Sequence, residues 1–188
     1  MRIALLPGSL RAGSYNRKLL LVAEQVLQKY GVETYPIDLM TLALPPYDGD
    51  IEEAEGLPDS VFVLKSKVTE AHAVIIACPE YSGGIPGAFK NALDWSTRGG
   101  SNPWTGKVVM LMGASAGPWG TNRMQPSLRA VLAVMGALVI PQSVTIPNAE
   151  QVWDEAGRVL DDVLPHRVEK VIARLLEVAS KMTGEQTI

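Results

Sequence analysis

The sequence predicts an α/β protein built on a doubly wound sheet of five parallel strands, in the order 2-1-3-4-5, with helices on both faces. Strand and helix signals alternate along its 188 residues, as in proteins whose parallel strands are joined by crossover helices. The segments 73–78 and 108–112 are apolar throughout, which is typical of strands buried on both faces. Pro36 lies within the second strand and predicts an edge position, because proline cannot donate to a neighbouring strand.

The N-terminal elements follow from short patterns. The apolar run 3–6 predicts the first strand. Asn16 can cap a helix whose apolar residues recur at helical spacing until Gly31 ends it. Residues 32–39 then predict the second strand.

The middle of the chain is predicted as a loop, a helix, a strand and a second helix. Residues 41–56 are rich in proline and acidic side chains, and we expect a loop. Asp59 or Ser60 can cap the helix that follows. The buried strand 73–78 comes next, and Pro86 suits the first turn of a further helix.

Four elements complete the series. The second fully apolar strand covers 108–112, and a helix is expected from about 122 to 135. A fifth strand begins at 138–140, and an amphipathic helix over about 165–182 closes the chain. No linker interrupts this alternation, so we expect a single domain over residues 1–188.

Two polar loops occupy the position where this fold binds ligands. In a sheet of this order, ligands bind beyond the carboxyl ends of the strands, near the switch between the first and third strands. The loops 8–16 and 79–87 follow those two strands. We therefore expect the binding site where these loops meet.

The first of these loops carries the donors that an anion needs. Ser9 and Ser14 offer hydroxyl groups, Asn16 offers a side-chain amide, and Arg11 offers a charged guanidinium group. The N-terminus of the following helix adds free N–H groups at the same place. The loop therefore predicts a phosphate site, although serine, glycine and asparagine are also common in ordinary turns. It contains neither a P-loop nor a Gly-x-Gly-x-x-Gly pattern.

The second loop has three glycines and two prolines within nine residues, 79–87. Such a rigid loop can hold backbone N–H groups against a flat ring, and together the two loops indicate a flavin nucleotide. For Glu80 a structural role is favoured over that of a general base, and Tyr81 can flank the ring. The alternative is a plain crossover turn before a helix. The candidate ring contacts are Pro79, Glu80, Tyr81, Ser82 and Gly83.

Composition argues against several other classes. The 17 basic and 20 acidic residues give a net charge of −3, unlike the basic surface of a nucleic-acid binder. One cysteine excludes an internal disulfide, and two histidines leave little material for a metal site. The apolar segment 1–7 is too short for a signal peptide, and no run approaches the roughly 18 residues of a membrane span. We expect a soluble cytoplasmic protein with no metal and no nucleic-acid or membrane partner.

The residues of the two loops also resemble a known family. The pattern Gly-Ser-x-Arg-x-x-Ser-x-Asn and the pattern Pro-Glu-Tyr-Asn, followed by Pro-Gly-x-x-Lys-Asn-Ala-x-Asp-Trp, are similar to those of the NADPH-dependent FMN reductase family of flavodoxin-like flavoproteins. The resemblance spans at least residues 2–136, and Ser82 stands where asparagine is usual. The matching residues are Gly8, Ser9, Arg11, Ser14, Asn16, Pro79, Glu80, Tyr81, Pro86, Gly87, Lys90, Asn91, Ala92, Asp94 and Trp95.

The resemblance implies an oxidoreductase that uses FMN, with NADPH or NADH as co-substrate. Electrons would then pass to a small-molecule acceptor, such as a quinone, an azo compound, a metal oxyanion or free flavin. The first motif would bind the FMN phosphate and the second the isoalloxazine ring, with Ser115 in a third loop, 113–120, as a further contact. No catalytic side chain is expected, because the flavin carries the chemistry.

The resemblance also points to a homodimer or homotetramer with the helix 86–95 near a subunit contact. We expect the same from Phe89 and Trp95, which carry more apolar area than a sheet-covering helix usually buries. Arg123 and Arg129 are candidates for a nucleotide phosphate, but solvated or inter-subunit pairing is favoured for both.

Two other functions fit the same fold. One is a flavodoxin-type electron carrier without substrate turnover of its own. The small net charge of −3 argues against this carrier. The other is a sensor of a phosphate ligand, since fold does not fix function. The match in the ring loop speaks against this sensor.

Overall fold

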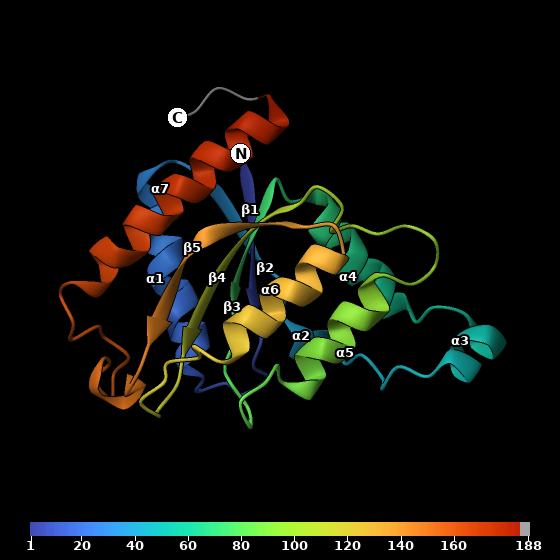
Figure 1. Cartoon of the computed structure of the whole chain (residues 1–188), viewed down its shortest axis with the longest axis horizontal. Helices are drawn as coiled ribbons and strands as arrows, with labels where there is room; N and C mark the ends of the chain where they lie inside the picture. The colour runs from blue at the N-terminus through green and yellow to red at the C-terminus, as the bar shows by residue number, and fades with distance from the viewer. Residues whose placement is uncertain (185–188) are drawn as a thin grey trace.

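The computed structural model describes residues 1–184 and has the predicted fold (Figure 1). Five parallel strands form one sheet in the order β2-β1-β3-β4-β5. The arrowheads of β4 and β5 in Figure 1 mark the lower edge, where the carboxyl ends lie. The strands are β1 (Arg2–Pro7), β2 (Glu33–Pro36), β3 (Ala73–Ala77), β4 (Val108–Ala114) and β5 (Leu138–Ile146).

The helices cover the sheet on both faces. α1 and α7 lie on one face, whereas α4, α5 and α6 lie on the other (Figure 1). None of the helices within residues 1–184 has the length and apolar character that crossing a bilayer requires. The helices are α1 (Tyr15–Lys29), α2 (Leu39–Leu42), α3 (Gly49–Glu55), α4 (Asp59–Glu70), α5 (Gly87–Ser96), α6 (Met124–Val134), α7 (Leu164–Thr183) and a 3₁₀ turn η1 (Ala149–Gln151).

Two hydrophobic cores result from the alternation of side chains along the strands. On β1, Ile3 and Leu5 pack with α1 and α7, whereas Ala4 and Leu6 pack on the opposite face. Successive strand side chains point to opposite faces, so a strand covered on both sides must be apolar at every position. All five residues of β3 and all seven of β4 are buried, which explains their unbroken apolar sequence.

The edge position of the second strand is confirmed. β2 pairs with β1 alone, and Pro36 is its last residue. The strand is shorter than the predicted 32–39, because Asp38 instead accepts a hydrogen bond from the backbone N–H of Met40 and caps α2.

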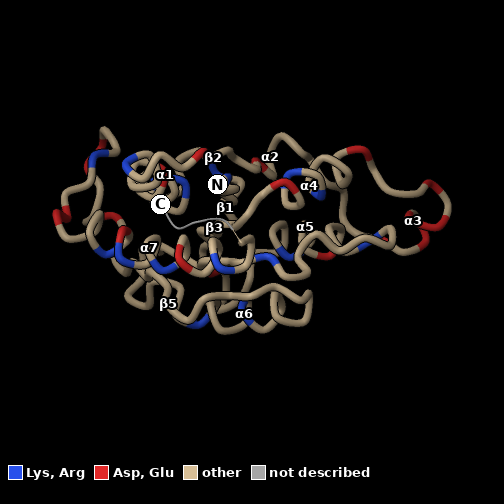
Figure 2. Tube along the Cα trace, turned by 90° about the horizontal axis from the view of Figure 1, so that it is seen from above, with Lys and Arg blue, Asp and Glu red and all other residues tan. Residues whose placement is uncertain are grey.

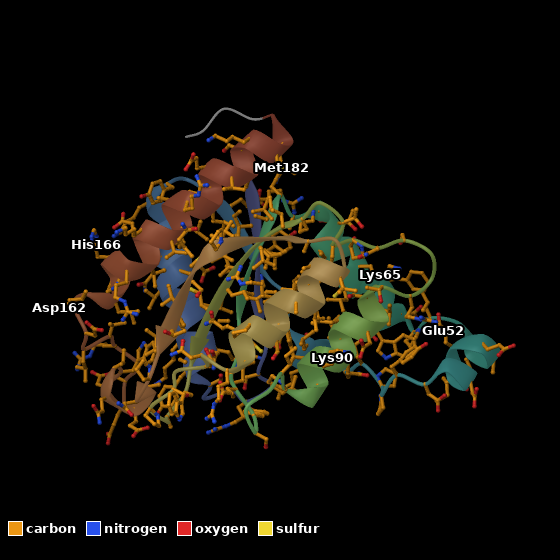
Figure 3. The ribbon with its side chains drawn as sticks, viewed as in Figure 1. Glu52, Lys65, Lys90, Asp162, His166 and Met182 are labelled. Carbon is orange, nitrogen blue, oxygen red and sulfur yellow. The ribbon has the colours of Figure 1, made fainter. Side chains whose placement is uncertain are left out.

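The prediction of a plain loop over 41–56 is wrong, since it contains the end of α2 and all of α3. α3 has no buried residue and protrudes from the rest of the chain (Figures 1 and 2). Arg98 holds this protrusion through an ion pair with Glu52, 2.7 Å between Nε and Oε2. Figure 3 labels Glu52 at this end of the molecule, with Asp162 and His166 at the opposite end.

Two predicted helix caps are also wrong. Ser14, not Asn16, caps α1, because its hydroxyl accepts the N–H of Asn16. α4 begins after Pro58 with no side-chain cap, so neither Asp59 nor Ser60 caps it. The first difference matters for the site, since it frees the Asn16 side chain for a longer-range contact.

Candidate functional site

Three loops meet at the carboxyl ends of the central strands. They follow β1, β3 and β4, and backbone hydrogen bonds join their bases. The N–H of Gly8 donates to Ala77, and the N–H of Cys78 donates to Met112. The N–H of Ser115 likewise donates to Ile146 of β5. These hydrogen bonds therefore fix the positions at which the three loops begin.

The first loop has a buried floor and an exposed rim. Ser9 and Ser14 are buried, whereas Arg11 is exposed. The Ser9 hydroxyl accepts the N–H of Arg11 at 3.3 Å, and the Ser14 hydroxyl accepts the N–H of Asn16 at 3.2 Å. Each hydroxyl keeps its own proton to donate to an acceptor beside the N-terminus of α1.

Asn16 connects the first loop to β4. Its side-chain amide nitrogen donates to the carbonyl of Ala114 at 2.9 Å, and its amide oxygen accepts the N–H of Ala114 at 2.9 Å. Asn16 is buried, so this reciprocal pair satisfies both ends of the amide. The side chain thus positions the start of α1 and is occupied by protein contacts.

Gly8 is required by the close approach of Cys78, the residue that directly follows β3. A Cβ at this position would lie 2.4 Å from the Cys78 sulfur. Burial raises the pKa of the Cys78 thiol well above its usual range, since the thiolate has no solvation there. This environment disfavours the reactive form of the thiol.

The second loop is a tight hairpin turn. Tyr81 and Gly84 exchange backbone hydrogen bonds of 3.1 and 2.9 Å. Between them, Ser82 and Gly83 have φ values of 51° and 77°. Positive φ at both central positions defines a type I′ turn, which asparagine followed by glycine favours. The turn holds Tyr81 out at the surface, where its ring is half exposed.

Glu80 caps α6, although the two lie 43 residues or more apart in sequence. Its carboxylate accepts the N–H groups of Arg123 and Met124, each at 3.0 Å. The Arg123 Nε also donates to it at 3.0 Å. The Glu80 side chain is only 8% exposed, and these bonds hold its carboxylate at the N-terminus of α6, the positive end of the helix dipole. The contacts agree with the structural role favoured for Glu80.

The third loop follows β4, and its first residues contact residues later in the same segment. The Ser115 hydroxyl donates to the carbonyl of Gly117 at 3.2 Å. Thr121 has a φ of 75°, an uncommon conformation for a β-branched residue. Its hydroxyl oxygen would lie 2.0 Å from a Cβ on Gly113. Only glycine fits at position 113.

The two arginines considered for a nucleotide phosphate differ in the structure. Arg129 donates to the carbonyls of Val139, Ile140 and Pro141 on β5, at 3.1, 2.7 and 3.4 Å. Its guanidinium is thereby used within the fold. The Arg123 side chain is 60% exposed and lies on the rim of the site.

The second half of the longer motif has a role that sequence reasoning missed. The side-chain amide of Asn91 and the indole N–H of Trp95 both donate to the carbonyl of Pro45, each at 2.8 Å. Asn91 also accepts the N–H of Tyr47 at 2.8 Å. These bonds fasten the segment before α3 to α5. The spacing of four residues places both donors on one side of α5. This spacing is the feature of the sequence that could have indicated their shared role.

The apolar excess expected on α5 is absent from this helix. Phe89 and Trp95 are fully buried within the chain, in contrast to the sequence-based expectation. An exposed apolar groove of about 450 Å³ lies beside this helix, between the first loop, α2 and the start of α5. Its lining includes Leu10, Met40, Leu44, Pro46 and Ala88.

The structure brings all ten predicted site residues into these three adjoining loops. Ser9, Arg11, Ser14 and Asn16 lie in or beside the first loop, with Asn16 in the first turn of α1. The second loop holds Pro79, Glu80, Tyr81, Ser82 and Gly83, and the third holds Ser115. Within residues 1–184, no three histidine, cysteine, aspartate or glutamate side chains gather as a metal site would require.

Comparison with known proteins gives a consistent result. The model of the NADPH-dependent FMN reductase family matches residues 1–151. An NAD(P)H-dependent FMN reductase of Pseudomonas aeruginosa is 33% identical over 178 residues, 94% of each chain. A quinone reductase of Escherichia coli is 33% identical over 165 residues, 86% of each chain.

A solved structure shows the same arrangement over nearly the whole chain. It is the flavoenzyme NAD(P)H:(acceptor) oxidoreductase of Paracoccus denitrificans, with a TM-score of 0.81 and 28% identity. The match covers 96% of this chain and 98% of the other.

Proposed function

Because the chain belongs to the NADPH-dependent FMN reductase family, we propose that it reduces quinones at the expense of NAD(P)H, with FMN as its cofactor. The observation that carries this proposal is the meeting of three loops at the carboxyl edge, one with anion donors and one with an exposed turn. This is the edge at which doubly wound folds bind nucleotides.

The chemistry of the first loop fits the FMN phosphate. Ser9 and Ser14 each have a hydroxyl proton to donate, and Arg11 offers a charged fork at the rim. The N-terminus of α1, a helix of 15 residues, adds a positive potential. We assign direct phosphate contacts to these three side chains and a positioning role to Asn16.

The second and third loops fit the flavin ring. We propose that Pro79, Ser82 and Gly83 present backbone to the ring and that Tyr81 flanks it. Ser115 contacts the ring from the third loop, whereas Glu80 acts indirectly by fixing the second loop to α6. FMN held by these residues would supply the redox chemistry, which is hydride transfer from the dinucleotide followed by two-electron reduction of the acceptor.

An electron carrier, the alternative function, would behave differently from a quinone reductase. A carrier would exchange electrons with a protein and would not be reduced directly by NAD(P)H. The relatives named as FMN and quinone reductases favour turnover with small molecules. Azo compounds, metal oxyanions and free flavin are further acceptors within the proposal.

We also propose that residues 1–188 form one FMN-binding domain and that the protein is a cytoplasmic homodimer or homotetramer. The groove of about 450 Å³ beside α2 and α5 supports association, since it exposes Leu10 and Met40 next to the cofactor loops. The lone cysteine suits a reducing compartment.

A spectrum of the purified protein tests the function. We expect flavin absorbance bands, bleaching by NADPH or NADH without oxygen, and recovery of the bands on adding a benzoquinone. Mass analysis of the cofactor released by heat should give FMN. Absence of bleaching by both dinucleotides would favour the carrier, and recovery of mostly FAD would contradict the cofactor assignment.

A further inference from the structure

Trp119 is the tryptophan that this chain leaves at its surface. Its side chain is 57% exposed in the third loop. The other three, Trp95, Trp104 and Trp153, are at most 4% exposed. A large aromatic ring that stays in solvent beside a ligand site is a common anchor for a flat ligand.

Arg123 fixes the orientation of this indole. Its guanidinium carbon lies 5.3 Å from the centroid of the Trp119 ring, a cation–π contact. The same guanidinium is tied to Glu80 through the 3.0 Å bond from Nε. Glu80 in turn holds the backbone at Arg123 and Met124. The indole is therefore linked through Arg123 to the second loop.

These contacts place an aromatic face and a positive charge on the same rim. Trp119 belongs to the loop after β4, and Glu80 to the loop after β3. The proposed flavin ring lies against both loops. A molecule that binds next to this ring thus has the indole and the exposed Arg123 head within the same part of the site.

We propose that Trp119 and Arg123 bind the adenosine-phosphate end of the nicotinamide dinucleotide. The adenine stacks on the free face of the indole, and a phosphate oxygen accepts hydrogen bonds from the terminal amino groups of Arg123. This inference rests on the proposed function, since the nicotinamide end must reach the flavin.

The pairing of an indole with a guanidinium favours the dinucleotide over the quinone. A dinucleotide has both a base to stack and phosphates to pair with the charge. A quinone is neutral: its carbonyl oxygens can accept a hydrogen bond from Arg123, but it brings no negative charge to pair with the guanidinium. The rim therefore matches the electron donor, and the acceptor is expected to be insensitive to it.

Single-turnover kinetics of the FMN-loaded protein separate the two half-reactions. Bleaching by NADPH or NADH is followed without oxygen, and recovery is then started with a benzoquinone. We expect Trp119→Ala to raise the dinucleotide concentration for half-maximal bleaching rate about tenfold. The limiting bleaching rate and the quinone dependence of recovery should stay unchanged. Trp119→Phe should restore most of the affinity, because phenylalanine can still stack.

Phe62→Ala is the matched control. Phe62 lies on α4, outside the three loops, and its side chain is also 57% exposed. Its removal should leave both half-reactions unchanged. An unchanged dinucleotide dependence in Trp119→Ala would overturn the inference, and so would an effect confined to quinone recovery.

Calorimetry with ADP gives a readout that does not need turnover. ADP has the base and phosphates but no nicotinamide, so it should bind the FMN-loaded protein and compete with NADPH. The Trp119→Ala variant should bind it about tenfold more weakly. A wild-type protein that NADPH bleaches but ADP does not bind would contradict the inference and leave the proposed function intact. Failure of both dinucleotides to bleach the wild type would instead count against the proposed function.

Discussion

At the scale of single residues, the site separates side chains that can reach a ligand from those that hold the loops. Arg11 and Tyr81 are exposed, whereas Asn16 and Glu80 are engaged with backbone groups of other elements. Motif residues of both kinds lie side by side in sequence. Their roles differ because the partners of Asn16 and Glu80 come from distant parts of the chain.

Arg11→Ala should weaken FMN binding more than Glu80→Gln does. Arg11 offers charge-assisted hydrogen bonds to a phosphate, which contribute roughly 1.5–3 kcal/mol. That corresponds to a loss of about ten- to hundredfold in affinity. Glu80→Gln keeps the size of the side chain and removes its charge. Titration of both apoproteins with FMN measures the difference, and equal losses would mean that the phosphate lies elsewhere.

Cys78→Ser should leave NAD(P)H-dependent quinone reduction nearly intact. The chain has no second cysteine to form a dithiol, and burial raises the pKa of the Cys78 thiol well above its usual range. Stability should fall by about 1–3 kcal/mol, since a hydroxyl is placed in an apolar, fully buried position directly after β3. Unfolding and turnover are therefore measured separately. A loss above about tenfold in turnover of the folded, FMN-loaded variant, roughly 1.4 kcal/mol, would contradict a flavin-only mechanism.

At the scale of elements, distant residues complete the ends of helices and loops. α6 has no capping side chain of its own and receives one from the loop after β3. The segment before α3 is held by two donors on α5. Such contacts join segments that lie far apart in the sequence and hold them in place against each other.

Ser82→Asn should stabilise the hairpin turn of the second loop. Ser82 has a φ of 51°, and asparagine tolerates this conformation better than serine does. We expect a rise of a few tenths of a kcal/mol in the free energy of unfolding, on the order of propensity differences in turns, with FMN affinity equal or higher. Thermal unfolding and FMN titration measure both. Weaker FMN binding would show that the Ser82 hydroxyl itself contacts the cofactor.

Gly113→Ala should disrupt the start of the third loop. The added methyl group would lie 2.0 Å from the Thr121 hydroxyl oxygen and 2.8 Å from the carbonyl oxygen of Cys78. Overpacking of this kind typically costs about 1–3 kcal/mol. Chemical denaturation should show the loss. Gly13→Ala is the control, because a Cβ there meets nothing within 4 Å.

At the scale of the whole molecule, the exposed apolar groove beside α2 and α5 predicts self-association. Light scattering at micromolar concentration should give the mass of a dimer or tetramer. Met40→Glu, in a residue 53% exposed on the groove, should shift the mass towards the monomer by placing a charge there. A monomer mass for the wild type would remove this prediction.

Local patterns in the sequence were enough to predict the fold class, the strand order and the two main loops. Unbroken apolar runs identified β3 and β4, and Pro36 identified the edge strand, because each signal depends on local chemistry alone. Glycine, serine and arginine in the loops after β1 and β3 indicated the proposed anion and ring sites for the same reason.

The contacts that many of those side chains make could be seen only in the folded chain. Asn16 is bonded to Ala114, 98 residues away, and Glu80 to the start of α6. Phe89 and Trp95 are buried inside the chain, although their helix alone indicated an excess of apolar surface. The physical reason is that a hydrogen-bond partner or a buried face is chosen by packing between segments distant in sequence. No local pattern records that choice.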